Sequence, residues 1–262
     1  MPSPLSHRKN TLFIILSGVF LTNAIIAELI GVKIFSLEGT LGLPPARIPL
    51  LGDFVLDFNL AAGVVIWPVV FVTTDIINEY YGRRGVRLIS FFTVACISYV
   101  FVVIYVTTEL SPADFWLEVN SQDADGQPFD IDFAFDKVYL QGLGIIIGSL
   151  VAFLVGQLLD VIVFHRLRRL TGKDKIWLRA TGSTLVSQLI DSYVVLFIAF
   201  YVFGNWPIEQ VVAVGIVNYS YKFVVALAVT PLLYVAHYFI DRYLGQEIAE
   251  RMMEEASRDA AA

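Results

Sequence analysis

The sequence predicts an all-α integral membrane protein built as a bundle of six transmembrane helices. Of its 262 residues, 57% are hydrophobic and only 16% are charged, and the mean hydropathy is +0.70. The apolar residues fall in six blocks, each long enough to supply the roughly 20 residues that a helix needs to cross a bilayer core. These features are typical of a polytopic membrane protein that interacts mainly with the lipid bilayer.

We expect one membrane domain over residues 1–245 and a polar tail over 246–262 that forms a frayed helix. The first apolar block follows Arg8 and Lys9 and lacks a small-residue cleavage pattern, so it is interpreted as a retained helix and not as a signal peptide. Pro68 predicts a kink near the middle of the second helix. The six helices are expected at about 11–35, 59–80, 86–107, 138–164, 180–203 and 209–240.

The distribution of basic residues predicts that both termini are cytoplasmic. Of the 18 Lys and Arg residues, 14 lie in segments that share one side of the membrane if there are six spans. These segments are the N-terminal stretch, the two loops that follow residues 80 and 164, and the tail. Basic loops stay on the cytoplasmic side, so the loop 109–136, which has eight acids and no base before Lys137, faces outward.

Polar residues at helical spacing form a seam inside the predicted bundle. A charged residue near the bilayer centre costs about 2.5 to 3.5 kcal/mol, so such residues usually face the bundle interior and mark a pathway or a site. Asp75, Asn78 and Glu79 share one helix face with Phe71, because residues three and four apart are neighbours on a helix. The other members of the seam are Asn23, Gln157, Asp160, Gln188, Asp191, Asn218, Tyr219 and Lys222.

Depth in the membrane separates a candidate binding cavity from the rest of the seam. Asp75, Gln188, Asp191, Asn218 and Lys222 are expected deepest. They predict either a substrate cavity or a purely structural hydrogen-bonded network. Lys222 is expected to neutralise a buried carboxylate, that of Asp191 or of Asp75.

Three further candidates for the cavity lining are Asn23, Phe71 and Tyr219. Phe71, Trp67 and Tyr219 either stack on a flat ligand or serve only to pack the helices. Asn78 lies between the cavity and the cytoplasmic edge.

A second group of residues is expected near the cytoplasmic edge, where it would form an inner gate or structural contacts. Glu79 lies close to Arg83 in the sequence, and Gln157 precedes Asp160 by one helical turn. For Asp160, an interfacial ion pair and a ligand contact are both compatible with the sequence.

No motif for catalysis, for a metal or for a cofactor is found. The sequence lacks a Walker phosphate loop and a Gly-x-Ser-x-Gly nucleophile elbow, and its three histidines do not pair at i, i+4. The single Cys96 excludes an intrachain disulfide. No soluble basic face is available for nucleic acid. We therefore expect a protein that is not an enzyme and does not bind nucleic acid directly.

Four motifs carry a resemblance to a known family. They are Trp67-Pro68 with Thr74-Asp75-x-x-Asn78-Glu79-x-x-Gly82, then Gly156-Gln157-Leu158-Leu159-Asp160, then Ser183-Thr184-Leu185 with Asp191-Ser192, and finally Asn218-Tyr219-x-Tyr221-Lys222. In their order and spacing they resemble the queuosine precursor transporter family.

The resemblance implies a six-helix, multi-pass importer in the cell inner membrane. Its substrates would be 7-cyano-7-deazaguanine and the 7-aminomethyl relative, which are precursors of the queuosine base in tRNA. The family is similar in fold to the S-components of energy-coupling-factor transporters, but is taken to work without an ATPase module. The long acidic loop 109–136 and Glu28 depart from the family pattern.

A deazaguanine presents N1–H and an exocyclic amine that one carboxylate can accept together, and a carbonyl that an amide or ammonium can donate to. Asp75 or Asp191 is the expected acceptor, assisted by Gln188 and Asn218, with Lys222 holding the carboxylates charged. Two alternatives stay open: a binding subunit that needs a separate ATPase, and the same fold carrying another purine or a vitamin. Proton coupling and facilitated diffusion fit equally well, and a homo-oligomer is compatible with the sequence.

Overall fold

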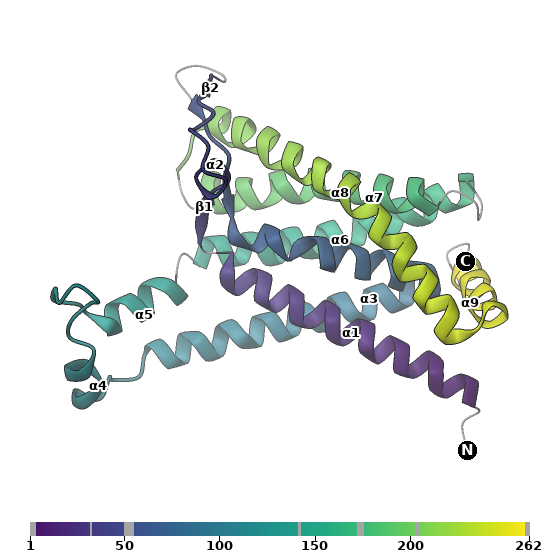
Figure 1. Ribbon diagram of the computed structural model, residues 1–262, viewed down its shortest axis with the longest axis horizontal. Helices are drawn as coiled ribbons and strands as arrows, with labels where there is room; N and C mark the ends of the chain where they lie inside the picture. The colour runs from purple at the N-terminus through teal and green to yellow at the C-terminus, as the bar shows by residue number, and fades with distance from the viewer. Residues whose placement is uncertain are drawn as a thin grey trace.

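The computed structural model is a bundle of long helices with a small strand region at one end (Figure 1). It describes residues 4–31, 33–49, 55–140, 143–171, 176–202 and 205–259. The beginning of the first helix and the last helix lie at the same end of the bundle (Figure 1). Within the described ranges, five helices are long and apolar enough to cross a membrane: His7–Ile30, Trp67–Thr108, Ile147–Thr171, Thr181–Val202 and Ile208–Leu244. The prediction of a helical, multi-pass membrane protein is confirmed.

The helices match most of the expected spans, with shifted ends. They are α1 Pro4–Ile30, α2 Leu37–Thr40, α3 Trp67–Thr108, α4 Asp114–Val119, α5 Ile131–Tyr139, α6 Leu143–Thr171, α7 Ile176–Leu196, α8 Ile208–Leu244 and α9 Gln246–Asp259, with a 3-10 turn η1 Ala62–Val65 and a π-helix η2 Phe197–Val202 that continues α7. The expected helix 138–164 begins later, because its first residues belong to α5. It also extends through the basic segment to Thr171.

Helix α3 reverses its direction at Gly82. This residue has φ 65° and ψ −167°, which is not helical. A Cβ placed on Gly85 would lie 3.3 Å from Cγ2 of Ile77, whereas eight residues of straight helix span about 12 Å. Figure 1 shows both ends of α3 on the side of the strand region. The first arm, 67–81, and the second arm, 83–108, correspond to the expected helices 59–80 and 86–107.

The first arm begins at Trp67, eight residues later than predicted. The preceding residues form a short strand and the turn η1 instead. Pro68 therefore lies in the first helical turn, where a missing N–H removes no intrahelical hydrogen bond. The predicted kink at Pro68 is wrong for this reason.

A strand region that the sequence did not predict covers the end of the bundle where α3 begins. Strand β1 (Ile34–Ser36) pairs antiparallel with β4 (Asn59–Ala61), and β2 (Ile48–Pro49) pairs antiparallel with β3 (Val55–Leu56). Helix α1 ends at Ile30 and not at residue 35 as expected, and β1 occupies residues 34–36.

The carboxylate of Glu38 organises this region. It accepts hydrogen bonds from the backbone N–H of Phe58 at 2.8 Å and of Ala46 at 3.4 Å, and from the Ser36 hydroxyl at 3.2 Å. The three donors come from separate points of the segment. The bond from the Phe58 N–H, followed by those to other backbone groups, lowers the pKa of Glu38 below its ordinary value of 4.5.

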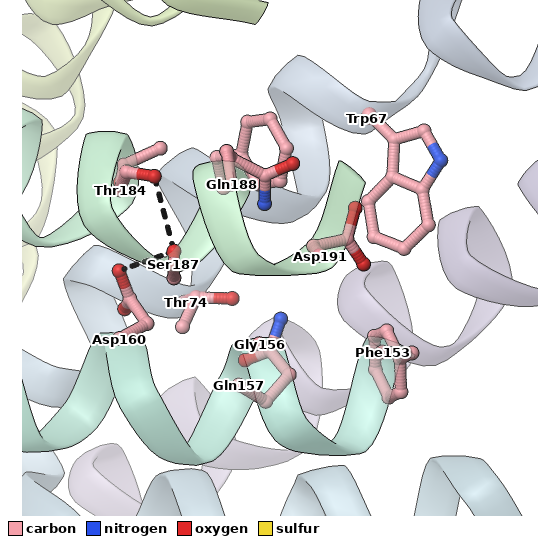
Figure 2. A pocket seen from close by; sticks show the side chains of 11 residues that line it. Trp67, Thr74, Phe153, Gly156, Gln157, Asp160, Thr184, Ser187, Gln188 and Asp191 are labelled. Carbon is pink, nitrogen blue, oxygen red and sulfur yellow. Dashed lines mark hydrogen bonds between the residues drawn. The ribbon is translucent and has the colours of Figure 1, made fainter. Parts of the chain in front are cut away.

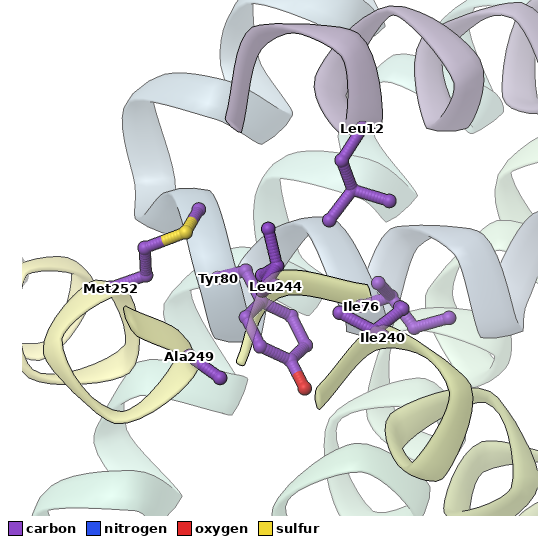
Figure 3. Packing of buried hydrophobic residues seen from close by; sticks show 7 residues of the cluster. All are labelled: Leu12, Ile76, Tyr80, Ile240, Leu244, Ala249 and Met252. Atoms are coloured by element: carbon purple, nitrogen blue, oxygen red, sulfur yellow. The ribbon is translucent and has the colours of Figure 1, made fainter. Parts of the chain in front are cut away.

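Helix α9 is folded and packed, so the prediction of a frayed tail is wrong. Ala249, Met252 and Ala256 are buried and lie on one helix face at intervals of three and four residues. Figure 3 shows Ala249 and Met252 directed toward Tyr80 of α3 and Leu244 of α8. The four glutamates of α9, Glu247, Glu250, Glu254 and Glu255, are exposed. The tail was misread because two alanines and a methionine contribute little to its overall hydropathy.

The core of the bundle joins α1, both arms of α3 and α6. Phe20 of α1 is fully buried and packs with Val70 and Ile77 of the first arm and with Ile89 of the second arm. Phe153 of α6 completes this cluster, with its ring centroid 6.1 Å from that of Phe20. This packing holds the first arm in a fixed rotation, with one face toward α6 and α7.

We predict that Gly82→Ala destabilises the turn of α3. A side chain is strained at this φ, and the added Cβ would lie 3.2 Å from both Cα and the carbonyl oxygen of Ala256. The free energy of unfolding should fall by about 1 to 3 kcal/mol, as measured by thermal unfolding in detergent. The matched control is Gly18→Ala in α1, where no atom lies within 4 Å of the added Cβ. Equal stability of the two variants would contradict the prediction.

Glu38→Gln should lower the melting temperature at neutral pH, because the ionised carboxylate is the better acceptor for its three donors. The pKa of Glu38 is lowered in the folded state. Its stabilisation is therefore present above the ordinary pKa and is lost as the pH falls through the folded pKa. The difference in melting temperature between Glu38→Gln and wild type should thus become smaller below about pH 4.5. Glu118→Gln, at an exposed residue of α4, is the control; a constant difference at all pH values would refute the role of Glu38.

Candidate functional site

A narrow pocket lies between the first arm of α3, α6 and α7 (Figure 2). Its cavity volume is about 10 Å³, which is room for about one water molecule. A flat bicyclic ligand therefore needs side chains or helices to move before it can enter. The lining residues are Trp67, Phe71, Thr74, Phe153, Gly156, Gln157, Asp160, Thr184, Ser187, Gln188 and Asp191.

One end of the pocket is aromatic. The ring centroid of Trp67 lies 5.7 Å from that of Phe71, with the planes at 24°, and 5.9 Å from that of Phe153. Trp67, Phe71 and Thr74 follow one another at helical spacing and so face the pocket from one side of the first arm. Figure 2 shows Trp67 and Phe153 on either side of the Asp191 carboxylate. This end suits a flat, partly apolar ring system.

Amides and a carboxylate line the middle of the pocket. Gln157 projects from α6, and Gln188 and Asp191 project from the facing helix α7 (Figure 2). Gln157 and Gln188 are 7% and 8% exposed. Among the described residues, Oε1 of Gln157 has no hydrogen-bond partner, and an unpaired buried polar atom costs about 1 to 3 kcal/mol. A polar ligand would supply the missing partner.

Lys222 of α8 pairs with Asp191. Its Nζ lies 2.5 Å from Oδ2 of Asp191, and the two side chains are 19% and 17% exposed. This contact selects Asp191 over Asp75 as the carboxylate that Lys222 neutralises. The second carboxylate oxygen of Asp191 remains available on the pocket side.

Asp160 closes the opposite end of the pocket and is held by neutral donors. Its Oδ2 accepts from Nδ2 of Asn78 at 3.3 Å, and its Oδ1 accepts from the Ser187 hydroxyl at 3.4 Å. The side chain is 5% exposed. The sequence allowed an interfacial ion pair for Asp160, whereas its hydrogen bonds here come from the neutral side chains of Asn78 and Ser187. Asp160 links the first arm of α3, α6 and α7.

Asp75 lies behind this pocket and not in it. It is 4% exposed and lines a second space of about 10 Å³ with Thr181, Thr184 and Thr230, between the first arm, α7 and α8. Its Oδ1 has no hydrogen-bond partner within the described ranges. Phe71 and Thr184 line both spaces, so they separate Asp75 from the main pocket.

Below Asp160, a buried ion pair joins three elements. Arg168 of α6 lies 3.5 Å from the Glu79 carboxylate, and these side chains are 5% and 2% exposed. Arg168 also donates to the carbonyl oxygen of Glu79 at 3.4 Å and to that of Met253 at 2.5 Å. The sequence had suggested the neighbouring arginines of Glu79 as its partners. Arg83 instead contributes to a separate basic pocket on α6.

Three expected residues lie apart from the pocket. Asn23 donates to the carbonyl of Val19 in its own helix at 2.8 Å. Asn218 and Tyr219 are half-buried on α8 and are not among the lining residues. Glu28, the unusual acid of α1, accepts from the hydroxyl of Ser149 at 2.6 Å.

Several lining residues were not predicted as site residues from the sequence. Trp67 was considered only as a possible stacking residue, Gly156 and Thr184 only as parts of motifs, and Phe153 not at all. A signal for Phe153 did exist, because it lies four residues before Gln157 and seven before Asp160 and so shares their helix face. Among the described residues, no group of three His, Cys, Asp or Glu side chains could hold a metal ion.

Comparisons with known proteins agree with this architecture. Residues 61–236 match the family described as "Putative vitamin uptake transporter". A probable queuosine precursor transporter from Bacillus subtilis is 33% identical over 187 residues, covering 68% of this chain and 73% of that protein. A protein of the same name from Haemophilus influenzae is 30% identical over 201 residues, covering 75% and 76%.

The queuosine precursor transporter of Escherichia coli is 27% identical over 174 residues, covering 66% of this chain and 70% of that protein. No solved structure matches this chain. The family match spans the pocket, both arms of α3, the helices α6 and α7, and α8 as far as residue 236. The chain therefore belongs to the queuosine precursor transporter family of vitamin-uptake-type membrane transporters, and is not an enzyme.

Proposed function

We propose that this protein imports 7-cyano-7-deazaguanine, and its 7-aminomethyl relative, across the cell inner membrane for the queuosine modification of tRNA. The observation that carries the proposal is the pocket between α3, α6 and α7, where two buried amides and a carboxylate lie beside an aromatic end. The names of the three relatives support this class of cargo.

The side chains of the pocket match the hydrogen-bonding groups of a deazaguanine. In the proposed complex, the free oxygen of Asp191 accepts from the N1–H and the exocyclic amine of the substrate. The amides of Gln157 and Gln188 donate to the ring carbonyl and accept from remaining N–H groups. Lys222 contacts the other oxygen of Asp191 from the far side. Trp67 and Phe153 stack on the ring faces.

We propose a supporting role for Asp75, which lies outside the main pocket. A buried carboxylate in an adjoining space can influence the charge of the pocket without touching the substrate. Asp75 lies next to three threonines of α7 and α8. It is therefore a candidate for coupling a conformational change at the pocket to those helices.

We further propose that the protein crosses the membrane six times, with each arm of α3 as one span, and that both termini are cytoplasmic. The loops at the end of the bundle that contains α9 are rich in Lys and Arg, in keeping with the positive-inside rule. In this orientation the Asn78–Asp160 contact, the Glu79–Arg168 pair and α9 form a closed inner gate, and the strand region faces outward.

We predict that Asp191→Asn lowers uptake of 7-cyano-7-deazaguanine about 10- to 100-fold, because a hydrogen bond to a charged group contributes about 1.5 to 3 kcal/mol. Uptake of labelled precursor into cells is compared at equal amounts of membrane-inserted protein. Asp75→Asn should reduce uptake less, because this residue lies outside the pocket. Asp114→Asn, on the exposed face of α4, is the inert control. Wild-type uptake by Asp191→Asn would refute the assignment.

The cargo itself is tested in a host that lacks both precursor synthesis and its own importer. Expression of this chain should restore queuosine in tRNA when the cyano precursor is supplied at low concentration. Excess guanine should compete only weakly and riboflavin not at all. Neither compound combines the guanine-like hydrogen-bonding edge with the substituent at position 7. Strong competition by riboflavin would instead assign the pocket to a vitamin.

Uptake by the purified protein alone in liposomes separates a complete transporter from a binding subunit. We expect precursor to accumulate to equilibrium without ATP or further proteins. Binding of precursor without any uptake would mean that a separate ATPase module is required.

A further inference from the structure

A second, basic pocket lies where α6 approaches the turn of α3. Its cavity volume is about 360 Å³, far larger than that of the substrate pocket. Its lining residues are Arg83, Ile162, His165, Arg166, Arg169 and Leu170. None of these residues takes part in the proposed transport chemistry.

The polar groups of this pocket lack protein partners. His165 is 4% exposed, and neither of its ring nitrogens has a hydrogen-bond partner among the described residues. The buried Nε of Arg83 is likewise unpaired there. No acidic side chain of the described chain lies within ion-pair distance of Arg166 or Arg169. His165 and Arg83 thus present unpaired buried nitrogens to the pocket, and the exposed guanidinium groups of Arg166 and Arg169 lie beside them.

Helix spacing explains how the residues converge. Ile162, His165, Arg166 and Arg169 lie three, four and seven residues apart and so occupy one face of α6. Arg83 is the first residue after the glycine turn of α3, and the turn brings it to the same face. His165 is further fixed by an edge-on contact with Phe164, at 5.5 Å and 80°.

The mouth of the pocket is apolar. Ile162 and Leu170 are 49% and 77% exposed on a helix that is long and apolar enough to cross the membrane. Exposed aliphatic side chains on such a helix face lipid. An occupant with a negatively charged head and a hydrocarbon chain would satisfy both parts of the site.

We propose that this pocket binds the phosphate of an anionic phospholipid, with the head held by Arg83, His165, Arg166 and Arg169 and an acyl chain lying along Ile162. Guanidinium groups suit phosphate because they donate two parallel hydrogen bonds to it. A basic pocket between membrane helices near one membrane surface is a recognised place for acidic headgroups. The apolar mouth favours a lipid over free inorganic phosphate, which shares the same head chemistry.

The test is the thermal stability of the full chain in detergent, titrated with defined ligands. Phosphatidylglycerol and cardiolipin should raise the melting temperature in a saturable way, and phosphatidylethanolamine and inorganic phosphate should do so much less. Arg166→Gln or Arg169→Gln should raise the half-saturating lipid concentration about fivefold each, and the double variant about 30-fold, since each arginine near an anionic headgroup contributes about 1 kcal/mol. Arg87→Gln, which removes the same charge from an exposed site on α3, should leave the concentration unchanged.

His165→Phe distinguishes a ligand site from a merely packed histidine. Without lipid, this variant should be as stable as wild type or more so, because two unpaired buried nitrogens are removed. Its stabilisation by phosphatidylglycerol should nevertheless shrink. Retention of the full lipid effect in His165→Phe and in the arginine variants would overturn the proposal. An equal effect of inorganic phosphate would also overturn it and would assign the pocket to a soluble anion.

Discussion

The ion pair between Glu79 and Arg168 fixes the geometry of one end of the bundle. Both side chains are almost completely buried, and removing one partner of such a pair is strongly destabilising because the other charge stays uncompensated. Arg168 also binds the main chain of Glu79 and of Met253 in α9. A single guanidinium therefore holds α6, the end of the first arm of α3 and the C-terminal helix together.

The reversal of α3 follows from the same junction. Gly82 lies three residues after Glu79 and takes a conformation that side chains rarely adopt. Helix α9 packs against this turn, and a Cβ on Gly82 would lie only 3.2 Å from Cα and the carbonyl oxygen of Ala256. The second arm then returns beside α1, and Phe20 packs between the two arms. The long apolar stretch of α3 thereby forms an antiparallel pair of helices.

Polar residues of the first arm make successive contacts along the helix, starting from the Glu79–Arg168 ion pair. Glu79 pairs with Arg168, Asn78 binds Asp160, and Thr74 lines the pocket one turn further. Each step is about one turn of helix or less. At the end of the pocket, the Asp160 carboxylate accepts hydrogen bonds from Asn78 and Ser187. The middle of the pocket contains the unpaired Oε1 of Gln157 and the carboxylate of Asp191, which Lys222 contacts. The contrast marks the place where a ligand adds contacts that the protein does not supply itself.

The sequence by itself determined the membrane-spanning helices, the polar seam and the family, since these depend on apolar length, residue type and motif order. It did not predict the strand region, because strands of two or three residues carry no periodic signal. It also could not decide between Asp75 and Asp191. Neighbouring residues on a helix point about 100° apart, and only packing against other helices sets the rotation that turns Thr74 into the pocket and Asp75 away from it. The tertiary structure decided that rotation, through Phe20 and its neighbours, and with it that Asp75 lies outside the pocket that Asp191 lines.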